Sequence, residues 1–292
     1  MPRNLDRLLR DYIAPPPGLK PVDFGAPPGA PALFEPNSVS WRVMKNPVAL
    51  VVGGFAAVIL ELAEPRVRTG VWEHTTFRTD PVTRIRRTGY AACVTIYGPA
   101  DTARGMISGV VRAHNRVEGR TPAGAPYRAN DPELLTWVHA TAVYGFVEAY
   151  NRYVRDLGSE DTDRFYAEGA PAAALYGADK PPRSRAELEA IFAGMAPKLE
   201  RSDILLEFFS ILRTAPLLPV KALQRLMLRG AVSMTPDWAR ETLGLGREFS
   251  LRAGELTLLR ALAAAGERFV LEEAPPAQAC KRLGLPANYL YR

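Results

Sequence analysis

The chain has 292 residues, of which 47% are hydrophobic and 23% are charged, as in ordinary globular proteins. This length allows one large core or two modest domains. The formal net charge is +6, from 37 Lys and Arg against 31 Asp and Glu, with no block of like charges. Such a distribution indicates a solvated basic surface, with weak attraction to anionic membranes as the alternative. Zinc-finger, basic-zipper and aromatic-basic motifs are absent from the sequence, which argues against nucleic acid as a partner.

Cysteine usage and the N-terminus indicate the compartment. The two cysteines, Cys93 and Cys280, are far apart in apolar or helical context, which argues against a disulfide framework, a zinc site or an iron–sulfur cluster. The first seven residues are polar and contain no apolar signal-peptide core. We therefore expect a protein of the reducing cytoplasm.

The first 45 residues are rich in proline and glycine, which predicts an extended N-terminal arm lying on the rest of the protein. A short helix is expected over Leu5–Ile13, and a second can begin near Ser38. Residues 46–292 are expected to form a single helical domain.

An apolar run from Val48 to Leu62 follows Asn46-Pro47 and has Glu61 near its end. It is shorter than the roughly 20 residues that span a bilayer. We interpret it as a buried core helix, with interfacial membrane contact as the alternative. No stable membrane span is expected.

Capping signals predict the next helices in chain order. After a loop-like stretch that contains His74, Asp80 and Pro81 indicate the start of a helix over 81–97. Asp101 indicates a cap for a helix over 102–117. A polar loop over 119–130 then leads to a long helix that begins at Asp131-Pro132 and ends near Leu157.

The rest of the chain also reads as helix, and a capping box is expected at Ser184 and Glu187. Few segments alternate with a period of two, so a substantial sheet is not expected. One further helix is predicted to begin near residue 159. The others are predicted over 185–196, 200–213, 219–232, 236–243, 251–266 and 276–283.

Two histidines lie on apolar faces of these helices. His114 shares a face with Ile107 and Val110, and His139 lies on the apolar stripe of the long helix. A histidine in such a place is either a hydrogen-bonded core residue or a ligand for a transition metal or haem iron.

Arg84 and Thr88 lie one turn apart on a helix with small residues at Ala91 and Ala92. A buried arginine needs an anionic partner, either a protein carboxylate or a propionate of a cofactor. Thr88 can bond back to its own helix. The sequence contains no nucleophile elbow, phosphate-binding loop or dinucleotide fingerprint.

Four short motifs follow one another along the chain: Arg84…Thr88, His114…Val117…Gly119, Tyr127…Ala129…Asp131-Pro132 and Trp137-Val138-His139-Ala140. In this order they resemble the MpaB/rubber-oxygenase catalytic-domain family, which includes the latex clearing proteins. Later segments near Asp163, Pro182 and Met234 are also similar, so the resemblance covers roughly residues 40–250.

This resemblance implies an all-α, globin-like helical bundle that holds haem b and acts with dioxygen on an apolar substrate. His114 would be the proximal iron ligand, with Arg84 and Thr88 near the haem. His139 would be a second pocket residue, either a hydrogen-bond partner or a competing ligand. Thr88, Thr95, His139 and Tyr144 are the candidates for a polar catalytic group on the distal side.

The sequence departs from the family pattern at Arg87, where latex clearing proteins have a lysine. Arginine stays protonated and is a poor metal ligand, so polyisoprene is not the expected substrate. We expect a haem-dependent oxygenase for a small apolar molecule, with alkenes as one candidate class. The alternative is a non-catalytic helical protein that binds or senses haem or an apolar ligand.

Overall fold

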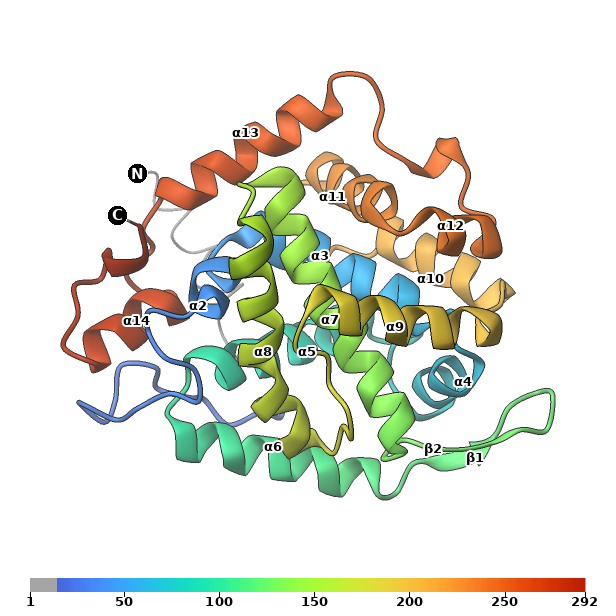
Figure 1. Cartoon of the computed structure of the whole chain (residues 1–292), viewed down its shortest axis with the longest axis horizontal. Coiled ribbons are helices and arrows are strands. Elements are labelled where there is room, and N and C mark those ends of the chain that lie inside the picture. Colours follow the sequence, from blue (N-terminus) through green and yellow to red (C-terminus); the bar gives the residue numbers. More distant parts are fainter. Residues whose placement is uncertain (1–14, 292) are drawn as a thin grey trace.

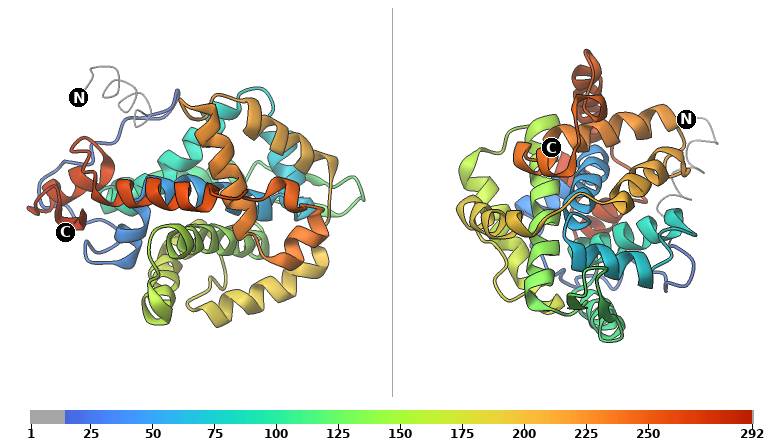
Figure 2. Two further views of the ribbon diagram at one scale, coloured as in Figure 1. Left: turned by 90° about the horizontal axis from the view of Figure 1, so that it is seen from above. Right: turned by 90° about the vertical axis from the view of Figure 1, so that its right-hand side faces the viewer.

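The computed structural model describes residues 15–291 and is mostly helical (Figures 1 and 2). The helix expected over Leu5–Ile13 lies outside the described residues. The all-α prediction is confirmed, while the globin-like arrangement stays a prediction. The α-helices are α2 (Val39–Met44), α3 (Pro47–Glu61), α4 (Pro65–His74), α5 (Pro81–Tyr97), α6 (Ala100–His114), α7 (Pro132–Tyr153), α8 (Gly158–Tyr176), α9 (Arg185–Met195), α10 (Asp203–Thr214), α11 (Lys221–Met234), α12 (Asp237–Leu243), α13 (Glu255–Arg268) and α14 (Pro275–Arg282).

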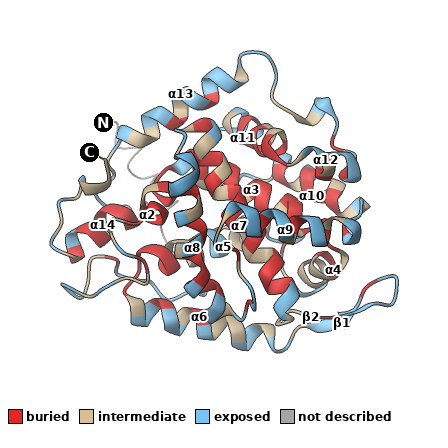
Figure 3. Cartoon of the chain, in the orientation of Figure 1, coloured by how far each residue is buried: buried red, intermediate tan, exposed pale blue. Residues whose placement is uncertain are grey.

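Helices α3 and α7 form the centre of the fold and the most extensive contact between two elements (Figures 1 and 3). Their backbones meet at Gly53 and Gly145. A Cβ added at Gly53 would lie 2.7 Å from the carbonyl oxygen of Gly145, too close for any side chain. The absence of side chains at this crossing lets the two helices pack backbone to backbone.

The apolar run is a buried core helix, as predicted. Asn46 begins α3, because its Oδ1 accepts hydrogen bonds from the amides of Val48 at 3.0 Å and Ala49 at 3.2 Å. Within residues 15–291, no single helix has the length and apolar character to cross a membrane. Helices α3 and α4 meet those criteria together, with a bend of 109° between them.

Several predicted caps are confirmed. The side chains of Asp80, Asp131 and Ser184 accept hydrogen bonds from backbone amides in the first turns of α5, α7 and α9. The prediction at Asp101 is wrong: α6 begins at Ala100 with Pro99 as its cap, and Asp101 lies in the first turn. An acidic residue there is still favourable, since it faces the positive end of the helix dipole.

The loop-like stretch before Asp80 instead contains helix α4, which ends at His74. Pro65 is the first residue of this helix, where its missing N–H leaves no hydrogen bond unmade. Glu64 supplies the cap by accepting from the amide of Val67 at 2.8 Å. Proline can therefore end one helix and begin the next within a few residues.

The loop expected over 119–130 contains a small antiparallel hairpin of β1 (Glu118–Arg120) and β2 (Pro126–Arg128), which extends beyond the helices (Figure 1). Tyr127 of β2 is buried and attaches the hairpin to α4. Its hydroxyl donates to Glu73 Oε2 at 3.0 Å and lies 3.0 Å from Nε2 of His74. Three-residue strands are too short for a period-two pattern to reveal them.

The described part of the arm, from residue 15 to Ser38, is irregular and lies against α5 and α14. Arg282 of α14 is buried and donates to the carbonyls of Phe24 at 2.6 Å, Ala30 at 2.9 Å and Tyr97 at 2.8 Å. These bonds join the arm, α5 and the C-terminal helix at one side chain. The boundary between the arm and the helical domain at residues 45 and 46 stays a prediction.

The helix crossing leads to a first prediction. Gly53→Ala should lower the free energy of unfolding by about 1–3 kcal/mol through overpacking, although alanine favours a helix by about 1 kcal/mol over glycine. Gly54→Ala is the matched control, because an added Cβ there meets nothing within 4 Å. It should leave stability unchanged or raise it. Urea unfolding of the two variants tests this, and equal effects would contradict the proposed crossing.

Candidate functional site

Arg84 and Thr88 lie on α5, one turn apart, and bond to each other. The guanidinium of Arg84 donates to Oγ1 of Thr88, and the Thr88 hydroxyl lies 3.2 Å from the Arg84 carbonyl oxygen. Thr88 therefore bonds back to its own helix and also holds the arginine side chain. Burial lowers the pKa of Arg84, with Glu61 acting in the opposite direction.

Glu61, the last residue of α3, is the nearby carboxylate that the sequence analysis did not assign to the site. Burial raises its pKa to about 7, while the charge of Arg84 and a hydrogen bond from Thr141 of α7 act to lower it. A carboxyl with such a pKa is both an acid and a base at neutral pH. The available signal was a single acidic residue closing an otherwise apolar helix.

His114, the last residue of α6, is partly buried and belongs to the same group. Burial, followed by the positive charge of Arg84, lowers its pKa below the usual value, and Asn130 partly offsets this effect. Its ring is therefore neutral at pH 7, the form that binds metals. Its buried Nδ1 has no partner with good hydrogen-bond geometry within residues 15–291.

His139, in the middle of α7, faces α8. A Cβ added at Gly169 of α8 would lie 3.2 Å from Cε1 of the imidazole, so the ring packs directly against the α8 backbone. Burial alone lowers the pKa of His139 to about 4. Its Nε2 is buried and unpaired among the described residues.

The structure thus brings four residues from three helices into one group: Glu61 of α3, Arg84 and Thr88 of α5, and His114 of α6. The pKa of His139, by contrast, is lowered by burial alone. The charge of Arg84 acts on both Glu61 and His114, and it is the link between α3, α5 and α6.

Two of the candidate distal residues are engaged elsewhere. Tyr144 donates to the carbonyl of Met234 at 2.6 Å, which directs its hydroxyl to α11. Thr95 bonds to the carbonyl of Ala91 at 2.9 Å and lies 3.1 Å from the Tyr176 hydroxyl. Two candidates remain. The Thr88 hydroxyl lies beside Arg84, and Nε2 of His139 has no partner among the described residues.

A sequence model of one family, described as "ER-bound oxygenase mpaB/B'/Rubber oxygenase, catalytic domain", matches residues 41–268. The chain belongs to this family. Membership implies an oxygenase-type activity, which takes dioxygen and an organic substrate. Comparisons with curated proteins and with solved structures gave no match.

The family match includes every candidate residue from Arg84 to His139. It also includes Arg87, which replaces the lysine of the latex clearing proteins. The Arg87 guanidinium donates to the carbonyl of Pro17 at 2.6 Å and so contacts the N-terminal arm. Arg87 therefore makes a structural contact with Pro17, which lies outside the residues that the family model matches.

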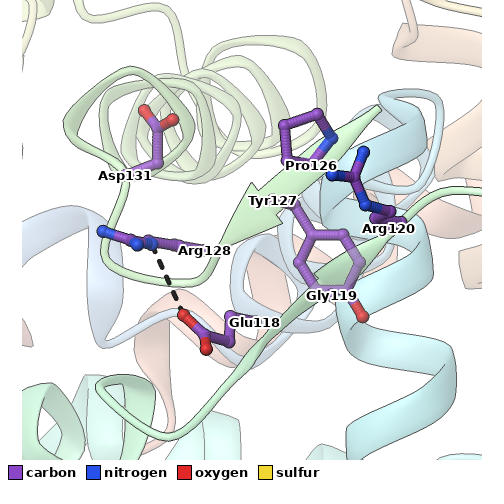
Figure 4. Close-up of a pocket in the computed structure, with 7 residues that line it drawn as sticks. All are labelled: Glu118, Gly119, Arg120, Pro126, Tyr127, Arg128 and Asp131. Atoms are coloured by element: carbon purple, nitrogen blue, oxygen red, sulfur yellow. Dashed lines mark ion pairs between the residues drawn. The ribbon is translucent and has the colours of Figure 1, made fainter. Parts of the chain in front are cut away.

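Two surface hollows are not lined by Glu61, Arg84 or His114. A hollow of about 620 Å³ lies on the hairpin, where Arg128 pairs with Glu118 at 3.4 Å (Figure 4). Another, of about 380 Å³, lies at the end of α12. Within the described residues, no three His, Cys, Asp or Glu side chains cluster in a way suited to a metal ion.

The carboxyl of Glu61 leads to a second prediction. The pKa of Glu61 is raised in the folded protein. Between about pH 4.5 and 7, the folded protein therefore keeps a proton that the unfolded chain has released. Stability contributed by this group therefore falls as the pH rises through that window. Glu61→Gln should gain stability relative to the wild type from pH 5 to 8, on the order of 1–3 kcal/mol.

Urea unfolding of the ligand-free protein at several pH values measures this difference. Glu160→Gln, on an exposed first turn of α8, is the matched control for the loss of one carboxylate. A Glu61→Gln difference that stays flat or shrinks with rising pH would be inconsistent with a buried, partly protonated carboxyl.

Proposed function

We propose that the protein is a haem b-dependent oxygenase that uses dioxygen to oxidise a small apolar molecule, with alkenes as the first class to test. The family supplies the oxygenase class. The observation that supports haem is the partly buried His114 imidazole at the end of α6, which burial and the charge of Arg84 keep neutral.

The residues present fit the chemical requirements of this cofactor. His114 offers the neutral imidazole that iron binds. Arg84 is the one permanently charged member of the group, since Glu61 is partly protonated at neutral pH and His114 is neutral. The group is therefore net positive and suits an anionic propionate. When bound, haem supplies the binding and activation of dioxygen.

The chain's own residues would support this chemistry in separate ways. Thr88 holds the Arg84 side chain and offers a hydroxyl next to it. Glu61 can take up or release a proton at its carboxylate near neutral pH. The apolar side chains of α3 and α7 exclude water from the interior beside it, which limits side reactions. His139 would be a second pocket residue or a competing ligand.

A third prediction tests the cofactor. The purified or haemin-reconstituted wild type should show a Soret band that His114→Ala loses, because that variant removes the proposed ligand. His74→Ala is the matched control, since its imidazole bonds to Tyr127 at the hairpin, and it should retain the band. His139→Ala should also retain it.

Other results would overturn parts of this proposal. A colourless protein that does not bind haemin would exclude the haem function. Loss of the band in His139→Ala with retention in His114→Ala would exchange the ligand assignment. Oxygen uptake with a panel of apolar alkenes tests catalysis separately, and a haem protein without substrate-dependent uptake would favour binding or sensing.

A further inference from the structure

Asn130 lies between the hairpin and α7, directly before Asp131, the cap of α7. The backbone around it is held by two hydrogen bonds, one to the segment between α6 and β1 and one to the hairpin. The amide of Ala129 donates to the carbonyl of Val117 at 2.9 Å, and that of Asp131 donates to Arg128 at 3.0 Å. Tyr127, three residues earlier, attaches the same hairpin to α4. The family motif around Tyr127 and Asp131 therefore fixes where Asn130 lies.

The orientation of the Asn130 amide follows from its partners. Its Nδ2 donates to the carbonyl of Val111, in the last turn of α6, at 3.0 Å and also to Oδ1 of Asn115. A backbone carbonyl can only accept, so the nitrogen must be the atom that faces it. The amide oxygen is consequently the atom left to face another neighbour.

That oxygen and Nδ1 of the His114 ring are chemically complementary. Oδ1 of Asn130 and Nδ1 of His114 are both buried, and each lacks a partner with good geometry within the described residues. One is an acceptor and the other becomes a donor when it carries the ring proton. The bond from Asn130 to Val111 also places this amide against the last turn of α6, the turn that ends at His114. Leaving two such atoms unpaired would cost about 1–3 kcal/mol each.

We propose that Asn130 is a positioning residue whose Oδ1 accepts the Nδ1–H of His114 and leaves Nε2 free to bind the haem iron. This inference rests on the proposed function, because it assigns a role to Asn130 only through His114 as ligand. An acceptor at Nδ1 fixes the tautomer and orientation of the ring and makes it a stronger donor to iron. A stronger donor stabilises ferric haem and lowers its reduction potential.

The test compares four haemin-reconstituted proteins: the wild type, Asn130→Ala, Asn130→Asp and Asn115→Ala. Haemin titration gives the affinity, and redox titration gives the midpoint potential. Asn130→Ala removes the acceptor, so we expect haem to bind about 10–100-fold more weakly, as for other partners of metal-bound histidines. Its midpoint potential should be higher than that of the wild type.

The other two variants separate hydrogen bonding from packing. Asn130→Asp keeps an acceptor and adds negative charge, so its midpoint potential should fall below that of the wild type while haem still binds. Asn115→Ala removes the other side-chain partner of the Asn130 amide but keeps the acceptor, so both quantities should stay near wild-type values.

Three results would overturn this inference alone: unchanged affinity and potential in Asn130→Ala, a raised potential in Asn130→Asp, or an equal effect of Asn115→Ala. If Asn130→Ala does not fold, the direction of the Asn130→Asp shift decides. A wild type that binds no haem, or a His114→Ala variant that binds it as well as the wild type, would overturn the proposed function and this inference with it.

Discussion

The contact on which the rest of the fold depends is the crossing of α3 and α7 at Gly53 and Gly145. Because neither glycine has a Cβ, the two backbones approach more closely than residues with side chains would allow. The same two helices bring Glu61, two turns beyond Gly53, to Thr141, one turn before Gly145. A structural constraint in the core thus determines which polar groups meet at the candidate site.

The second constraint is electrostatic. Burial favours the neutral forms of both Glu61 and His114, and it is the larger cause of both shifts. The charge of Arg84 acts against burial at the carboxyl and with burial at the imidazole. One guanidinium therefore lowers the pKa of both groups, which favours the charged carboxylate and the neutral imidazole, and this is a reason for an arginine, always charged, at this position.

Much of the fold could be predicted because its signals are local. Asp80, Asp131 and Ser184 cap helices as expected, since a cap depends only on a side chain and amides two or three residues away. The failures also have physical reasons. Pro65 satisfies the rules for both a helix end and a helix start, and the β1–β2 hairpin depends on the distant contact of Tyr127 with α4.

By itself, the sequence determined most of the helices, the order of the motifs and, through them, the family, and it supplied Arg84, Thr88, His114 and His139 as candidate residues. These follow from spacing along the chain, which local backbone chemistry and residue identity fix. Only the tertiary structure decided that Glu61 joins Arg84 and His114, that His139 faces α8 and that Asn130 lies beside His114. Those neighbours come from segments separated by many residues, and their approach depends on how the helices pack around the α3–α7 crossing.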